Sequence, residues 1–211
     1  MKITKLGHCC LLIDEGNLRI LTDPGDYSAL QDEIIGINLI LITHEHSDHL
    51  HLESLKAVLK NNPQVKIITN DAVGKILAEQ KISFEKVVHG QNTNFSGVLI
   101  EGFGDKHADI YDTVTVVQNT GYFIANQFFY PGDALTNPEK PVKILALPVA
   151  GPWIKIREAV EYGKIIKPEF CFPVHDGMLR IFGAAHRIPQ TVLTDLGVMF
   201  HIPNNGQTLE F

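Results

Sequence analysis

Four apolar residues lead directly into a segment rich in His and Asp in the sequence Leu39-Ile40-Leu41-Ile42-Thr43-His44-Glu45-His46-Ser47-Asp48-His49. These four apolar residues predict a buried strand. Apolar residues then recur at helical spacing from Leu50 to Leu59, which predicts an amphipathic helix. The segment rich in His and Asp therefore lies on a strand-to-helix loop, where layered α/β folds commonly place their active sites.

The side chains of this loop are typical metal ligands. The imidazoles of His44 and His46 can bind one cation, while Asp48 and His49 can turn toward a second. A solvated polar turn is the competing interpretation. Three histidines within six residues seldom serve packing, so the sequence favours a metal site.

Short apolar or β-branched runs separated by turn residues extend to both sides of this stretch. They predict strands around residue 6 and over 9–13, 18–22, 65–69, 86–89, 98–103, 113–118, 121–125, 127–130, 143–147 and 169–173, with further short strands at the end. Helices are predicted over 71–80, with Asp71 as its cap, over 154–166 and over 189–196. Each half of the chain is sheet first and helices later, which predicts two packed sheets with helices outside.

Length and composition fit one domain over residues 1–211, with 45% hydrophobic and 20% charged residues. No apolar run reaches the ~18 residues of a membrane span, and the N-terminal residues lack the pattern of a signal peptide. Cys9, Cys10 and Cys171 are a sparse, odd set that we expect to be buried strand thiols, with the adjacent pair pointing to opposite faces of its strand. We therefore expect a soluble protein in a reducing cytoplasm.

The charge distribution bears on partners. The formal net charge is −6, and Lys and Arg are scattered rather than gathered in a stripe, so nucleic acid is not expected as a partner. The expected partner is a small-molecule substrate, with no membrane association. No pattern indicates an oligomeric state.

The motif His-x-His-x-Asp-His after a strand resembles the signature of the metallo-β-lactamase superfamily. The chain is most similar to its small branch of L-ascorbate-6-phosphate lactonase-like proteins, with Gly7-His8 near the start and Pro173-x-His175 near the end. This resemblance implies an α/β fold, the four-layer αββα sandwich, with the site at one edge between the sheets.

The resemblance also implies the remaining site residues. His107 matches the third ligand of the first metal, Asp133 the carboxylate that bridges both metals, and His175 the last ligand. Asp23 matches a residue that supports the ligand loop through hydrogen bonds. The expected metal ligands are thus His44, His46, Asp48, His49, His107, Asp133 and His175.

This ligand set implies a hydrolase with two divalent ions. A water that bridges the ions together with Asp133 would have a lowered pKa and supply a metal-bound hydroxide, oriented by Asp48, to a small lactone, phosphoester or phosphodiester. Imidazole and carboxylate ligands favour zinc but also suit manganese, iron or nickel. One alternative is a mononuclear iron-dependent thiol or persulfide oxidoreductase. Another is a metal-binding module without catalysis.

The sequence allows two roles for each of two further residues, His8 and Trp153. His8 either approaches the substrate side of the site or is structural. Trp153, the only Trp, either walls a substrate pocket or packs at the start of a helix.

Overall fold

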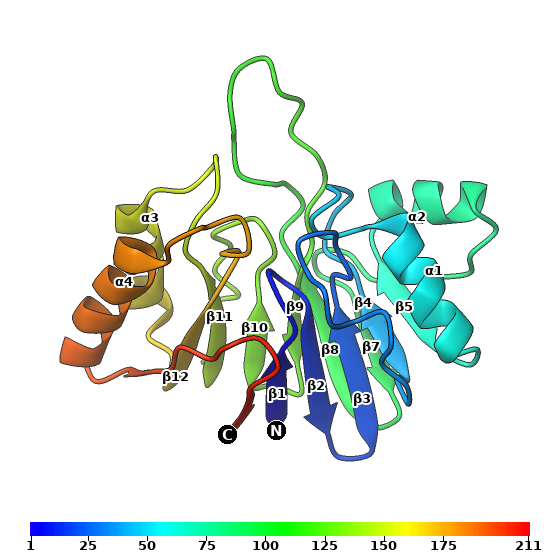
Figure 1. The fold of residues 1–211 in the computed structure, drawn as a ribbon, viewed down its shortest axis with the longest axis horizontal. Coiled ribbons are helices and arrows are strands. Elements are labelled where there is room, and N and C mark those ends of the chain that lie inside the picture. The colour runs from blue at the N-terminus through cyan, green and yellow to red at the C-terminus, as the bar shows by residue number, and fades with distance from the viewer.

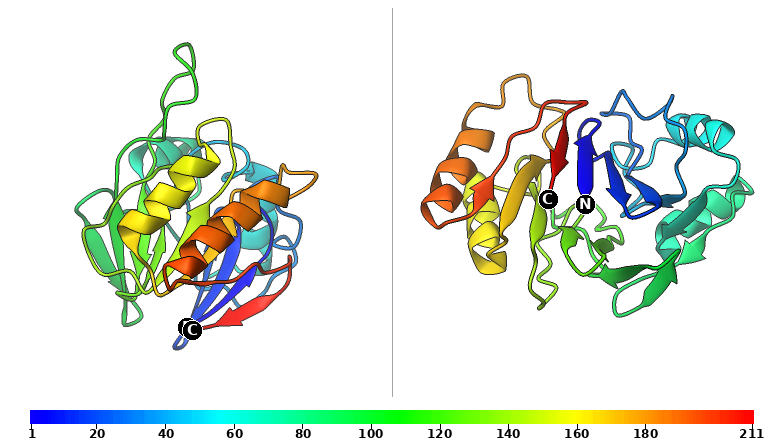
Figure 2. Two further views of the ribbon diagram at one scale, coloured as in Figure 1. Left: turned by 90° about the vertical axis from the view of Figure 1, so that its left-hand side faces the viewer. Right: turned by 90° about the horizontal axis from the view of Figure 1, so that it is seen from below.

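The chain forms two seven-stranded mixed sheets that pack face to face, with helices on both outer sides (Figures 1 and 2). The computed structural model describes all of residues 1–211. The first sheet has the order β14-β1-β2-β3-β4-β5-β6, and the second has the order β13-β12-β11-β10-β9-β8-β7. The four-layer α/β sandwich expected from the sequence is confirmed by this arrangement.

The strands of the first sheet are β1 (Lys2–Lys5), β2 (Leu11–Glu15), β3 (Leu18–Thr22), β4 (Leu39–Leu41), β5 (Lys66–Thr69), β6 (Glu85–Lys86) and β14 (Thr208–Glu210). Those of the second are β7 (Asn92–Phe95), β8 (Val98–Phe103), β9 (Gly121–Ile124), β10 (Phe128–Tyr130), β11 (Ile144–Pro148), β12 (Phe170–Val174) and β13 (Met199–Phe200). The helices are α1 (Leu52–Asn61), α2 (Asp71–Glu79), α3 (Ile156–Ile166) and α4 (Gly183–Asp195). Helices α1 and α2 cover the first sheet, and α3 and α4 cover the second.

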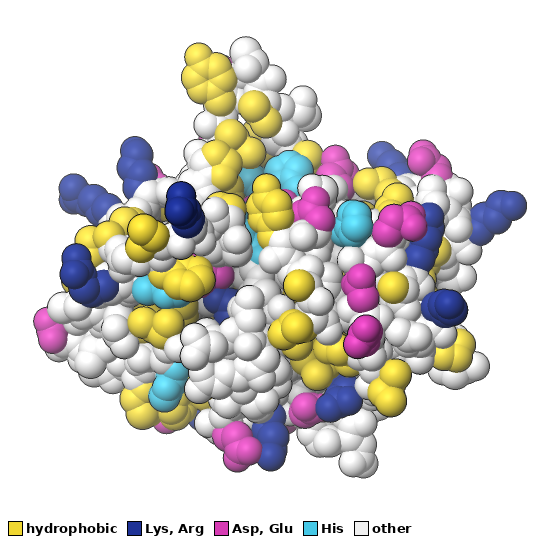
Figure 3. Space-filling view, in the orientation of Figure 1, with side chains coloured by type: hydrophobic (Ala, Val, Ile, Leu, Met, Phe, Trp, Pro, Cys, Tyr) yellow, Lys and Arg dark blue, Asp and Glu magenta, His cyan; other side chains and the backbone are white.

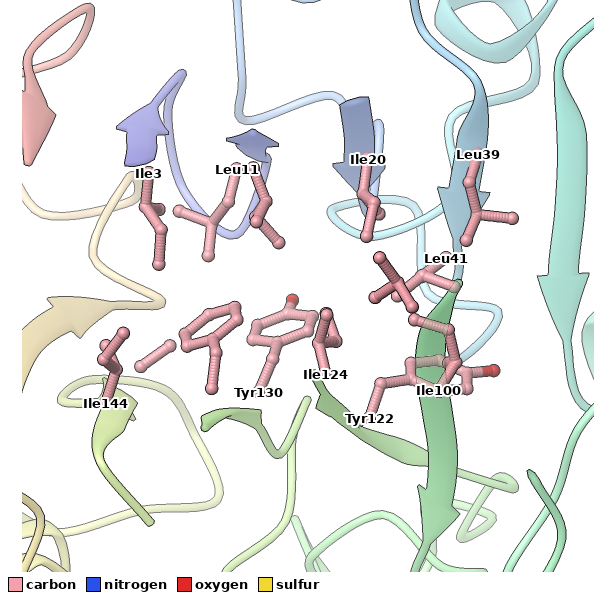
Figure 4. Packing of buried hydrophobic residues seen from close by; sticks show 14 of the residues in the cluster. Ile3, Leu11, Ile20, Leu39, Leu41, Ile100, Tyr122, Ile124, Tyr130 and Ile144 are labelled. Carbon is pink, nitrogen blue, oxygen red and sulfur yellow. The ribbon is translucent and has the colours of Figure 1, made fainter. Parts of the chain in front are cut away.

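Successive side chains of a strand point to opposite faces of its sheet. The apolar side chains therefore form three layers, a central core between the sheets and an outer core under the helices of each sheet. On β4, Leu39 and Leu41 face the central core between the sheets, whereas Ile40 faces the helices of the first sheet. Figure 4 shows the central core, where aliphatic side chains of the first sheet face Tyr122, Tyr130 and their neighbours from the second. Cys9 belongs to the central core and Cys10 to the outer one, so the adjacent thiols point to opposite faces as predicted.

The segment 113–118, predicted as a strand, is instead part of the long connection between β8 and β9. This connection projects from the edge of the sandwich (Figure 1). Val114 and Val116 are 42% and 43% exposed there. The prediction was wrong: the segment forms no strand, and both edges of the preceding strand β8 are already paired, with β7 and with β9.

Two helix starts also differ from the sequence prediction. Asn70, not Asp71, caps α2, because its side chain accepts the backbone N–H of Val73. Helix α4 begins at Gly183, six residues before the predicted start at Pro189, which lies buried inside the helix. No helix has both the length and the apolar character needed to cross a lipid bilayer.

Candidate metal centre

The predicted ligands converge because the strands that precede them run in the same direction. The loop of His44 to His49 follows β4, which pairs in parallel with β3, while Asp133 follows β10 and His175 follows β12. In the second sheet β10, β11 and β12 are also parallel neighbours. The carboxyl ends of these strands meet at one edge of the sandwich, where the loops bring the side chains together.

Two groups of ligand-type atoms lie side by side at this edge. The first group is His44, His46 and His107, whose ring nitrogens lie within 4.8 Å of one another. The second group is His8, Asp48, His49 and His175, with the same spacing. All histidines of both groups except His46 are buried.

Asp133 lies between the two groups and contacts both. Its Oδ2 is 3.3 Å from Nε2 of His107 in the first group and 2.7 Å from Nε2 of His175 in the second. Its Oδ1 is 3.1 Å from Nε2 of His49. The structure therefore brings all seven sequence-predicted ligands to one place, with Asp133 between the two groups.

The donor atoms fit metal binding, because several of them have no hydrogen-bond partner in the protein. These buried atoms are Nε2 of His44, Nε2 of His49, both ring nitrogens of His175 and Oδ1 of Asp133. Nε2 of His49 and Nε2 of His175 lie close to the carboxylate of Asp133. None of the five atoms, however, has the geometry of a hydrogen bond. Buried polar atoms are rarely left without a partner, and a bound cation would satisfy them. Imidazole nitrogen with carboxylate oxygen suits divalent transition metals.

A hydrogen-bond network behind the ligands fixes their orientation. Asp23 accepts hydrogen bonds from the backbone N–H and the hydroxyl of Thr43, at 2.8 and 2.7 Å, and from the hydroxyl of Tyr130. Its Oδ2 also lies 2.7 Å from Nδ1 of His49. Such partners hold each ring with its other nitrogen turned toward the metal. Asp23 therefore has the supporting position expected from the sequence.

Burial and neighbouring charges prepare most of the candidate ligands in the protonation state that binds metal. Burial lowers the pKa of His44 well below its usual value and also lowers the pKa of His46. Burial alone would raise the pKa of Asp133, but the charges of His49 and His175 hold it well below the usual value. Burial opposes the charged form of His49 too, yet Asp133 raises its pKa. His49 must therefore release a proton when a cation binds.

A cleft of about 260 Å³ opens onto the ligands. Its 11 lining residues are Tyr27, His46, Ser47, Asp48, His107, Ile110, Asp133, Pro152, Trp153, His175 and Met178. A larger hollow of about 780 Å³ lies against the projecting segment and shares His107 with the cleft. Histidine side chains are visible at the surface at the foot of this segment (Figure 3).

Of the two residues with open interpretations, Trp153 lines the cleft and His8 does not. Trp153 lines the cleft and also packs in the outer core, with edge-to-face contacts to His107 and His175. His8 is fully buried and does not line the cleft. Of its two interpretations the geometry favours the structural one, with the ring behind Asp48.

Sequence reasoning missed several residues of the site. Thr43 and Tyr130 are the hydrogen-bond partners of Asp23, and Thr43 could have been found because it directly precedes His44. Tyr27, Ile110 and Met178 line the cleft without any local sequence pattern that marks them. Only the fold brings these three to the same opening.

The αββα sandwich with this site at its edge defines the metallo-β-lactamase class of proteins. Residues 2–175 match the family described as Beta-lactamase superfamily domain, and the chain belongs to this superfamily.

Relatives of known sequence or structure agree with this assignment. The chain is 34% identical to Protein Rv0786c of Mycobacterium tuberculosis over 185 residues, covering 85% of each chain. It is 27% identical to the UPF0173 metal-dependent hydrolase MJ1163 of Methanocaldococcus jannaschii, covering 99% of each. Among solved structures, it shares its fold with Igni18, a metallo hydrolase from Ignicoccus hospitalis. The TM-score is 0.79 at 20% identity, with 100% of this chain and 98% of that chain covered.

Proposed function

We propose that this chain is a metal-dependent hydrolase that holds two divalent ions and cleaves a small ester-type substrate. The observation that carries the proposal is the position of Asp133, which contacts both ligand groups at the floor of an open cleft. The relative MJ1163, whose name is metal-dependent hydrolase, supports the reaction class.

The protein and the metal would divide the chemistry. Two divalent ions held by the ligand residues would activate a water at neutral pH and polarise the oxygen of the scissile group. The side chains hold this arrangement: Asp133 spans the two groups, while Asp48 lies at the cleft wall. We propose zinc as the metal, because zinc commonly binds imidazole and carboxylate, although manganese, iron and nickel fit the same donors.

No protein nucleophile is needed, and the cysteines are unsuited to be one. Cys9, Cys10 and Cys171 are buried, and burial raises the pKa of each thiol, that of Cys9 to about 11. A thiol that stays protonated is a poor nucleophile. We therefore propose direct attack by water, without a covalent enzyme intermediate.

The walls of the cleft favour some ester-type substrates over others. Tyr27, Ile110, Trp153 and Met178 give it apolar or aromatic walls, and its lining includes no Lys or Arg. A phosphomonoester dianion commonly binds Arg or Lys, which are absent here. A lactone or another uncharged ester gains from apolar walls, so we place it ahead of a phosphodiester and a phosphomonoester.

A substrate panel with metal-depleted and metal-restored protein tests this function. We expect hydrolysis of lactones or aryl esters that disappears after chelation, returns with zinc or manganese, and is lost in Asp133→Asn. The Lys164→Ala variant, on helix α3 and outside the cleft lining, is the control and should keep full activity.

Three outcomes would contradict the proposal. Oxygen uptake with a thiol or persulfide, one iron per chain and no hydrolysis would favour an oxidoreductase. Metal binding without turnover of any substrate would favour a module without catalysis. Hydrolysis that survives complete metal removal would exclude the metal-dependent mechanism.

A further inference from the structure

His8 is fixed at both its backbone and its ring by the turn that carries His175. The backbone carbonyl of His8 accepts the N–H of His175 at 3.0 Å. Its ring Nδ1 accepts the backbone N–H of Gly177 at 2.9 Å. Gly177 allows this close approach, because a Cβ at this position would lie 2.9 Å from Cβ of His8. The fully buried ring therefore has a single defined orientation.

The contact with Gly177 determines which ring nitrogen carries the proton. A nitrogen that accepts a backbone N–H carries no hydrogen, so the proton of a neutral ring is on Nε2. Nε2 lies 3.2 Å from Oδ2 of Asp48. The Nε2–H group therefore donates to the carboxylate of Asp48.

The same contact argues against His8 as a metal ligand, although its ring belongs to the second ligand group by distance. A ring nitrogen must be free of hydrogen to bind a cation. Binding through Nε2 would move the proton to Nδ1, where it would face the N–H of Gly177, and two donors would oppose each other. His175 has no such restriction, because neither of its ring nitrogens has a hydrogen-bond partner.

We propose that His8 is a positioning residue that holds Asp48 for the second metal through its Nε2–H and does not itself bind metal. Asp48 needs such a partner because Ser47 and Asp48 line the open cleft, where little else restrains the carboxylate. Oδ2 of Asp48 is 3.6 Å from Nε2 of His175, so the oxygen that His8 holds is the one that faces the second group. This inference rests on the proposed metal pair.

Two variants separate the two contacts of the ring. In His8→Gln the amide nitrogen can occupy the place of Nε2 and keep the donor to Asp48, while the acceptor for Gly177 is lost. In His8→Asn the amide oxygen can replace Nδ1 and keep the contact to Gly177, while the donor to Asp48 is lost. The readout is the affinity for the second zinc ion in competition with a chromophoric chelator, together with the melting temperature.

We expect His8→Asn to bind the second zinc roughly 10–100-fold more weakly, and His8→Gln to stay within a few-fold of the parent protein. Equal losses in both variants would make His8 a ligand and overturn the proposal. Loss in His8→Gln alone, in step with its melting temperature, would reduce His8 to an anchor of the 175–177 turn.

The proton position can be measured without any metal. Long-range ¹H–¹⁵N NMR of metal-free protein labelled at histidine should show the His8 proton on Nε2, and the same tautomer should persist after zinc is added. A proton on Nδ1 would contradict the inference. Because the first spectrum needs no metal, failure of this inference is distinguishable from failure of the two-metal proposal.

Discussion

Nδ1 of His49 lies 2.7 Å from Oδ2 of Asp23, beneath the candidate metal centre. The carboxylate holds the ring with Nε2 turned toward Asp133, 3.1 Å away. The same carboxylate also accepts hydrogen bonds from Thr43 and Tyr130, so one buried acidic group links the ligand loop to the second sheet.

Asp23→Asn should weaken metal binding without removing a ligand. An amide group would place a donor opposite donors from His49, Thr43 or Tyr130, and the ring of His49 would lose its orientation. We expect a loss of about 10–100-fold in affinity for the ion that His49 binds, measured by competition with a chelator. The exposed Asp32→Asn variant is the control. Unchanged affinity in Asp23→Asn would show that the ligand loop does not depend on this carboxylate.

Gly25→Ala should displace the ligand loop directly. A Cβ on Gly25 would lie 1.8 Å from the backbone oxygen of Asp48, so the chain around Asp48 must move. We expect weaker binding of the second metal and a lower melting temperature. Gly16→Ala is the matched control: it has open space and a positive φ of 59°, so it should cost about 1 kcal/mol of stability and leave metal affinity unchanged. Parent-like metal binding in Gly25→Ala would contradict the tight packing of these loops.

The cysteines should react only after unfolding. Burial raises the pKa of Cys10 and Cys171 well above that of a free thiol and that of Cys9 to about 11, so few thiolates exist at pH 8. We expect no rapid labelling by a disulfide reagent in native protein, and three labelled thiols per chain in denaturant. A thiol that reacts quickly in the native state would contradict the described burial and reopen the question of a covalent mechanism.

The sequence predicted the metal centre better than the residues around it, for a physical reason. Metal ligands are few in kind, and the spacing in His44-x-His46-x-Asp48-His49 identifies them before any fold is known. Tyr27 and Met178 line the cleft only because separate loops end at the same opening, which no local pattern records. The projecting segment shows the same limit: its alternating Val114 and Val116 fit a strand, yet the segment leaves the sandwich and both side chains are exposed.

A buried ionic cluster next to the site should contribute to stability. Lys5 Nζ lies 2.6 Å from Oδ2 of Asp176, and Nε2 of His186 lies 2.8 Å from the same oxygen. We expect Asp176→Leu alone to cost about 3–5 kcal/mol, because it leaves the buried charge of Lys5 without its carboxylate, and Lys5→Met alone to cost less, because Asp176 keeps His186. The double variant should cost less than the sum of the two, as measured by denaturant unfolding. Additive losses would show that the two charges do not interact.

The number of metal ions that each chain holds at saturation tests whether the two ligand groups bind two ions. Metal-free protein is incubated with excess zinc or manganese, freed of unbound metal and analysed for metal and protein in the same sample. Because Asp133 contacts both ligand groups, we predict two ions per chain in the parent protein and at most one tightly bound ion in Asp133→Ala. A single ion per chain in the saturated parent protein would contradict the two-metal account.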